Sequence, residues 1–172
     1  DRGGLMMKLG LDALKNDPKT KVITLISKPP AKEIASEMLA LAAKTGKPVV
    51  VCFIGGDRKE IESYGLTAAV SLEDAAHKAV ALSRGEKPVD YASFAMGEAK
   101  AEAMAKEIAG KMAKGQRYVR GFYTGGTLCD EAMKLMIGSL GHIYSNIPLN
   151  HEDALEDPKG GKSREHTFLD FG

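Results

Sequence analysis

Short apolar runs alternate with amphipathic segments through the first half of the chain. The apolar runs predict two strands buried on both faces and a third, shorter strand, at residues 22–26, 49–54 and 68–70. The segments between them repeat apolar residues every three or four positions, which predicts helices, over about residues 4–16, between Pro30 and Gly46, and from Ser71 onward. Strands and helices in this order indicate an α/β fold, a parallel sheet with helices on both faces.

The same periodicity assigns residues to the buried face of each helix. In the helix after Pro30 these residues are Ile34, Met38, Leu41 and Ala42. In the helix that begins at Ser71 they are Leu72, Ala76, Ala79 and Val80. Ser71 is a favoured N-cap residue, so we expect it to cap this helix.

The second half of the chain opens with a change of composition. Residues 84–97 contain Gly85, Pro88 and few aliphatic residues, and they predict a linker. We expect the next segment, residues 98–113, to form a helix that connects two lobes. Its buried face should comprise Ala101, Met104, Ile108 and Met112.

The segment Tyr118–Ala132 is the most informative part of the chain, because it predicts a strand, a Gly-Gly turn and a helix start. Gly125 and Gly126 lack a Cβ, so the backbone there can turn sharply and approach a ligand. Thr127 with Asp130 three residues later matches a capping box. The buried stripe of the helix should comprise Leu128, Ala132, Leu135 and Met136. Such a turn presents amide hydrogens to an anion; the alternative interpretation is a tight turn before a well-capped helix.

The chain ends in a polar segment and a last apolar run. Residues 146–165 contain Pro and Gly and predict a functional or mobile loop, and residues 166–171 predict a final strand. The predicted organisation is therefore a first lobe at 1–84, a linker and connecting helix at 85–116, and an incomplete second α/β lobe at 117–172.

A candidate anion or substrate site follows from these strand ends. Gly55 and Gly56 follow the second strand much as Gly125 and Gly126 follow a later one, and Lys28 ends the first strand. Open α/β sheets bind ligands at the carboxyl ends of their strands. The candidate residues are Thr124, Gly125, Gly126, Thr127, Leu128, Gly55, Gly56 and Lys28. For Lys28 a solvated loop position is the equal alternative.

Composition and charge narrow the function classes. The net charge of +1 gives no reason to expect nucleic acid or an anionic membrane as partner. No apolar run approaches the roughly 20 residues of a membrane span, and no signal peptide is visible, so the cytoplasm is the default compartment. The start on a Gly pair without an initiator Met suggests a fragment of a longer protein.

Cysteines and histidines give no clear site. Cys52 and Cys129 fit neither a disulfide framework nor a metal-binding spacing. Cys129 is a candidate reactive thiol near a helix N-terminus, with a small buried thiol as the alternative. The histidines and carboxylates of the C-terminal part match no ligand spacing, so no metal site is predicted, for His142, His151, His166, Glu152, Asp153 and Asp170.

Four segments, in this order, resemble the FdrA family, which is related to succinyl-CoA synthetase: Ile26–Ala31, Thr45–Val49, Phe53–Gly56 and Gly121–Leu128. The resemblance covers residues 3–140 and the final strand. It implies that residues up to about 84 resemble part of the CoA-ligase domain of the synthetase α subunit. Residues from about 117 resemble the start of the corresponding β-subunit domain, and both domains are flavodoxin-like.

The resemblance also indicates what this chain lacks. In the synthetases two helix N-termini, one from each subunit, face the phosphate of a phosphohistidine. The helix opening at Thr127 resembles the β-type helix, whereas its α-type partner, the ATP-grasp domain and the CoA-binding domain are not represented. The family histidine lies in a Gly-His-Ala-Gly loop, but residues 55–65 contain no histidine. His77 comes later, on a helix, and we do not assign it that role.

Three functions stay open at this point. The leading one is a subunit or fragment of an acyl-CoA synthetase-like enzyme acting on a small carboxylate or acyl substrate. No cofactor is assigned to this chain, CoA or a nucleotide is a candidate ligand of the full-length protein, and partner subunits or a homo-oligomer are expected. The second is carbamoyl transfer from oxamate in allantoin breakdown, with which FdrA-family proteins are associated. The third is a non-catalytic, ligase-like scaffold.

Overall fold

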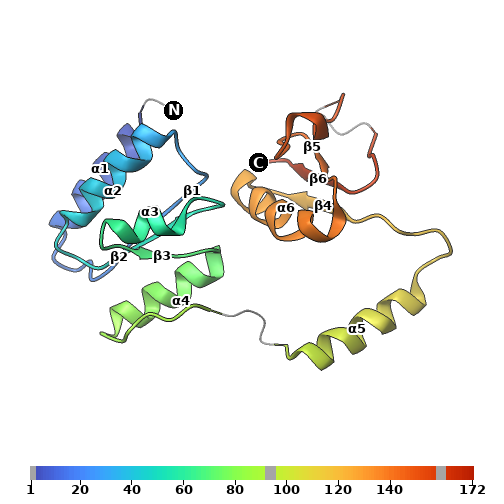
Figure 1. The fold of residues 1–172 in the computed structure, drawn as a ribbon, viewed down its shortest axis with the longest axis horizontal. Coiled ribbons are helices and arrows are strands. Elements are labelled where there is room, and N and C mark those ends of the chain that lie inside the picture. Colours follow the sequence, from blue (N-terminus) through green and yellow to red (C-terminus); the bar gives the residue numbers. More distant parts are fainter. Residues whose placement is uncertain (1–2, 92–95, 158–161) are drawn as a thin grey trace. The chain divides into compact units, whose positions relative to one another are not determined.

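The computed structural model describes residues 3–91, 96–157 and 162–172. The chain divides into two compact units, Asp1–Tyr91 and Ala92–Gly172. Each unit contains a three-stranded sheet in which all described pairings are parallel, flanked by helices (Figure 1). This arrangement confirms the predicted α/β class and is consistent with a flavodoxin-like fold.

The first unit alternates helices and strands as its sequence pattern predicts. Its elements are α1 (Leu5–Asn16), β1 (Ile23–Ser27), α2 (Lys32–Ala43), β2 (Val49–Phe53), α3 (Arg58–Ser63), β3 (Thr67–Ala68) and α4 (Leu72–Ser83). The sheet order is β1-β2-β3. All five residues of β2 are buried because this strand lies in the centre of the sheet.

Helices cover both faces of this sheet. On one face α1, α2 and α3 pack around a core that includes Met38 and Val51. On the other face α4 packs through Ala75 against Val50 and Cys52. The prediction that β1 is buried on both faces is wrong, since Ile26 is 43% exposed.

The second unit is built around the order β4-β6-β5. Its elements are α5 (Glu98–Lys111), β4 (Arg120–Tyr123), α6 (Gly126–Leu140), β5 (Tyr144–Ser145), the short 3₁₀ turn η1 (His151–Asp153) and β6 (Thr167–Asp170). The predicted final strand, β6, lies between the other two. Its Phe168 packs with Cys129 and Met133 of α6 on one face of the sheet.

Two buried helix faces in the first unit differ from the prediction. In α2 the buried residues are Ala35, Met38, Leu39 and Ala42, and Leu41 is 38% exposed. In α4 the buried residues are Asp74, Ala75 and Lys78, whereas Ala76 and Val80 are exposed. Leu72 and Ala79 pack against the core as predicted, but the prediction is wrong for Ala76 and Val80. Two inward positions of α4 are charged, so apolar periodicity could not identify them.

In the second unit the predicted buried face of α5 is wrong and that of α6 is wrong in part, since Ala132 and Met136 of α6 do pack against the core. No residue of α5 is buried among the described residues, and its apolar positions Met104, Ile108 and Met112 are exposed. On α6, Leu128 and Leu135 are exposed. The contacts of Cys129 and Met133 with Phe168 turn the buried stripe by one position.

No helix in the described ranges combines the length and the apolar character that a membrane span requires.

Candidate functional site

The turn after β4 leads directly into α6 at the carboxyl edge of the second sheet (Figure 1). Gly125 is the N-cap residue, and its extended backbone has φ −178° and ψ 121°. The helix therefore begins at Gly126, and Thr127 lies inside its first turn. The predicted capping box of Thr127 and Asp130 is wrong, because no side chain of the described residues caps this helix.

The first turn of α6 leaves backbone donors ahead of the helical ladder. The first backbone hydrogen bond of the helix runs from the amide of Cys129 to the carbonyl of Gly125, at 3.2 Å. The amides of Gly126, Thr127 and Leu128 precede it and have no carbonyl within the helix to bind. These residues are half-buried to exposed, and the first turn of α6 contains no acidic residue. The arrangement suits an anion, since the helix dipole places partial positive charge here.

The end of β6 closes one side of this turn. Phe171 donates its amide to the Tyr123 carbonyl at 2.8 Å. Gly172 then lies so close that a Cβ on it would come within 2.9 Å of the Thr124 carbonyl carbon and oxygen. A residue other than glycine would therefore displace the turn at Thr124. The sequence analysis did not identify Gly172, because its role depends on a contact between segments far apart in the chain.

Asn146 fixes the third strand end at the same edge. Its side-chain amide donates to the Asp170 carbonyl at 2.7 Å, and its side-chain oxygen accepts from the Asp170 amide at 3.0 Å. Asn146 thus extends the pairing of β5 with β6 by using its side chain as a backbone substitute. The carboxylate of Asp170 accepts a bond from the Gly172 amide at 3.0 Å. Apart from the polar character of residue 146, no local pattern indicated this pair.

Gly55 and Gly56 form a tight turn after β2. Gly56 donates its amide to the Phe53 carbonyl at 2.7 Å, and Gly55 has a φ of 77°, which favours glycine. A Cβ on Gly56 would lie 2.9 Å from the Phe53 Cβ. The next helix, α3, is capped by Asp57, whose carboxylate accepts from the Lys59 amide. The protein's own carboxylate therefore occupies the start of α3.

Lys28 lies exposed in the loop that follows β1. A cavity of about 340 Å³ opens there, and its wall includes Ser27, Lys28, Pro30 and Ile34. A neighbouring hollow of about 250 Å³ has a more apolar wall, which includes Met6, Met7 and Met38. Lys28, Gly55 and Gly56 belong to the first unit, whereas residues 124–128 belong to the second.

The cysteine and histidine candidates each pack against, or hydrogen-bond to, other residues of their own unit. Cys129 is fully buried in the core of the second unit, so the small buried thiol is the better interpretation. His77 lies exposed on α4, and its ring stacks on Tyr91 at 3.8 Å between centroids. His166 accepts a bond from the Val119 amide through Nδ1 at 3.1 Å.

A buried ion pair that the sequence analysis missed lies on α4. The Lys78 ammonium contacts the Asp74 carboxylate at 2.8 Å, and both side chains are almost fully buried. Lys78 also donates to the Ala68 carbonyl at 2.7 Å and pairs with Asp90 at 2.8 Å. Burial alone raises the pKa of Asp74, but the bond from Lys78 and two backbone amides outweigh it, so this pKa lies below its ordinary value. Only the i, i+4 spacing hinted at this pair.

Asp90 joins the segment after α4 to the first unit. Its carboxylate also pairs with Arg58 at 2.9 Å. The bonds from Arg58 and Lys78 lower the pKa of Asp90 to about 2. The adjacent Tyr91 amide donates to Asp74 at 2.9 Å. These contacts bind residues 90 and 91 to the first unit, beyond the predicted lobe end at residue 84.

A second titratable cluster lies in the other unit. His142 Nδ1 lies 2.7 Å from the carboxylate of Asp153, which is buried. The bond to Asp153 raises the pKa of His142 above its usual value. Glu152 joins them, and one ligand atom from each residue lies within 4.8 Å of the others. The sequence analysis named all three residues without pairing them.

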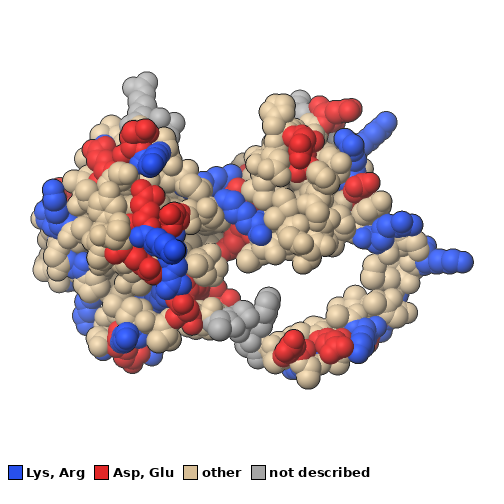
Figure 2. Space-filling model, viewed as in Figure 1, with Lys and Arg blue, Asp and Glu red and all other residues tan. Residues whose placement is uncertain are grey.

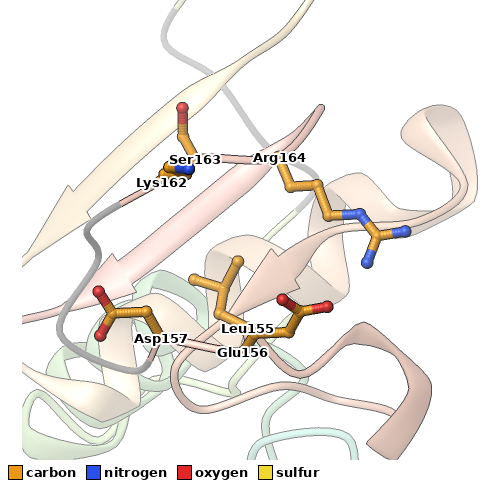
Figure 3. Close-up of a pocket in the computed structure, with 6 residues that line it drawn as sticks. All are labelled: Leu155, Glu156, Asp157, Lys162, Ser163 and Arg164. Carbon is orange, nitrogen blue, oxygen red and sulfur yellow. The ribbon is translucent and has the colours of Figure 1, made fainter.

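A cavity of about 660 Å³ opens beside residues 155–157 and 162–164 (Figure 3). Arg164 extends from this rim, and its guanidinium carbon lies 4.3 Å from the Tyr144 ring centroid. Across the visible molecular face in Figure 2, Lys and Arg are interspersed with Asp and Glu.

No family model matches this chain. It is similar to "Uncharacterized protein YahF" of Escherichia coli (strain K12), with 40% identity over 170 residues. The match covers 99% of this chain and 32% of YahF. The chain therefore spans about a third of the length of that relative.

Proposed function

We propose that this chain is the anion-binding part of a cytoplasmic FdrA-type, acyl-CoA synthetase-like enzyme that acts on a small carboxylate or acyl substrate. The start of α6 carries the proposal. Its N-cap, Gly125, has no side chain, its first turn has no acidic residue, and residues 124–128 are half-buried to exposed. The start of α3 is different, because Asp57 caps it. The resemblance of Gly121–Leu128 to the FdrA family supplies the enzyme class.

The anion would be held by backbone amides rather than by a cationic side chain. These are the amides of Gly126, Thr127 and Leu128, in the first turn of α6 directly after Thr124 and Gly125. Gly172 packs against that turn and Asn146 fixes Asp170 at the same edge. The geometry favours a small ligand with a terminal carboxylate or phosphoryl group, since amides at a helix start bind such oxygens well. Partner subunits or a second copy would supply the groups that this chain lacks.

Replacing Gly125 by Asp tests the anion site in the 172-residue chain. Backbone φ of −178° is accessible to any residue, and a Cβ on Gly125 would meet no atom of the described residues within 4 Å. The new carboxylate should cap α6 from within and compete with an external anion. Gly138→Ala is the matched control, because it lies in the same helix and its Cβ also meets no atom within 4 Å.

The readout is the amide NMR spectrum during titration with inorganic phosphate. We expect saturable shifts of the Gly126, Thr127 and Leu128 amides in the wild-type chain. Gly138→Ala should keep these shifts and Gly125→Asp should lose them. Shifts that are absent from the wild-type chain, or that persist in Gly125→Asp, would remove the anion-site proposal.

Carbamoyl transfer from oxamate is the second candidate. It is favoured by the absence of histidine from residues 55–65 and by the exposed position of His77, whose ring stacks on Tyr91. A reaction without a phosphohistidine suits this arrangement better than ligation does. Formation of carbamoyl phosphate or of acyl-CoA by a YahF-length protein would separate the two candidates. Phosphate binding without either product would instead support the non-catalytic scaffold.

A further inference from the structure

We infer that His142, Glu152 and Asp153 form a binding site for a divalent transition-metal ion, best represented by Zn²⁺. One nitrogen and two carboxylate groups offer ligand atoms within 4.8 Å of one another. His142 Nδ1 and an Asp153 oxygen are already 2.7 Å apart. A single ion could therefore be reached by all three side chains with small adjustments.

The fold itself brings these donors together. His142 is followed by the buried residue Ile143 and then by β5, and the two carboxylates lie in η1. Ser145 and Ala154 form a parallel bridge, and the Leu155 amide donates to the Ser145 carbonyl at 3.1 Å. These backbone contacts hold η1 beside the start of β5. The donor positions are thus set by the sheet.

The central ligand is a buried carboxylate directed towards an exposed ring. Asp153 is 1% exposed, and its second oxygen accepts a bond from the Asn150 side chain at 3.3 Å. This bond orients the carboxylate as an outer-shell partner does in a metal site. The His142 side chain is 62% exposed and Glu152 is also exposed, so an ion can enter and retain water.

The donor set indicates which ions fit. An imidazole nitrogen favours Zn²⁺ and related transition metals over Mg²⁺ and Ca²⁺, which prefer all-oxygen ligands. The two carboxylates neutralise the charge of a divalent cation. Three protein ligands leave a coordination position for water or for an anionic ligand. The competing interpretation is a hydrogen-bonded His–Asp pair that binds no ion.

Isothermal titration of the untagged 172-residue chain with Zn²⁺ tests the inference. We expect one saturable site in the wild-type chain. His142→Ala should weaken binding by more than ~10-fold, the least that loss of even an outer-shell group typically costs. Glu152→Gln, at an exposed position, should also weaken binding. His151→Ala is the matched control, because His151 is an exposed histidine of the same η1 turn and lies outside the cluster.

Co²⁺ gives a second readout that does not depend on heat. Its visible absorption should show a nitrogen and oxygen environment in the wild-type chain and in His151→Ala, and should change in His142→Ala. Far-UV circular dichroism of each variant verifies that it is folded. Absence of a saturable Zn²⁺ site, or equal Zn²⁺ affinity in the wild-type chain and the folded His142→Ala variant, would overturn the inference.

Discussion

At the residue scale, the most consequential side chains are charged and buried. Asp74 and Lys78 lie one helical turn apart, and each is almost fully removed from water. Removing one partner of such a pair leaves an uncompensated charge in a medium that solvates it poorly. The pair therefore makes α4 sensitive to substitutions that would be harmless on an exposed helix surface.

Lys78→Met should destabilise the first unit by about 3–5 kcal/mol, because it leaves the Asp74 carboxylate buried without its cation. Lys106→Met is the control, since Lys106 makes the same i, i+4 pair with Glu102 on an exposed surface. That substitution should lower the free energy of unfolding by less than about 1 kcal/mol. Urea unfolding followed by circular dichroism measures both, and equal costs would contradict the role assigned to burial.

The lowered pKa of Asp90 should make the stability of the first unit depend on pH in the acid range. Its folded pKa is about 2, below the ordinary value of 3.8, so its pairing stabilises the fold above pH 3.8. That contribution is lost as the pH falls from 3.8 through about 2. Asp90→Asn should therefore be less stable at neutral pH and lose less stability on acidification.

Urea midpoints measured across that pH window test the Asp90 prediction. Asp12→Asn, which changes an exposed carboxylate on α1, is the control and should keep the wild-type acid dependence. An acid dependence of Asp90→Asn that equals that of the wild-type chain would show that Asp90 does not stabilise the fold.

At the element scale, the helices differ in how their N-termini are capped. Ser71 caps α4 and Asp57 caps α3 as side chains, whereas α6 begins on Gly125. The cap of α4 was predictable, because Ser before an amphipathic run is a local signal. The N-cap of α6 was predicted two residues too late, at Thr127 instead of Gly125, since Thr127 and Asp130 imitate a capping box that the helix does not use.

Also at this scale, the apolar pattern located the helices but not always the face that packs. Leu128 fitted the expected stripe on α6, yet the sheet receives Cys129 and Met133. Both stripes are apolar, and the contact with Phe168 of β6 selects between them. A strand that is distant in sequence thus determines the rotation of the helix about its axis.

At the scale of the whole molecule, the chain consists of two compact units with separate cores. The first unit buries residues on both faces of its sheet, and the second packs α6 against its own sheet. Contacts of Asp90 and Tyr91 place the end of the first unit at Tyr91. The predicted lobe end at residue 84 did not include these contacts, because they join a Gly- and Pro-containing segment to buried side chains.

A fragment of residues 1–91 should fold on its own, because it contains a complete sheet with both faces covered. We expect a cooperative thermal transition by circular dichroism. A shorter fragment, residues 1–84, should be less stable because it lacks Asp90 and the Tyr91 amide. A non-cooperative 1–91 fragment, or equal stability of the two fragments, would contradict this assignment.

The sequence by itself determined the α/β class, most strands and the Gly-Gly turn before α6, because apolar periodicity, glycines and caps act within a few neighbouring residues. The tertiary structure alone decided the central place of β6, the packing of Gly172 on Thr124 and the pairing of Asn146 with Asp170. It also decided the Asp74–Lys78 pair and the grouping of His142 with Glu152 and Asp153. Most of these features join residues that are distant in sequence, and the Asp74–Lys78 pair joins charged residues whose burial depends on the rest of the fold. The free energy of such contacts depends on burial and on the distance between the groups, which local patterns do not encode.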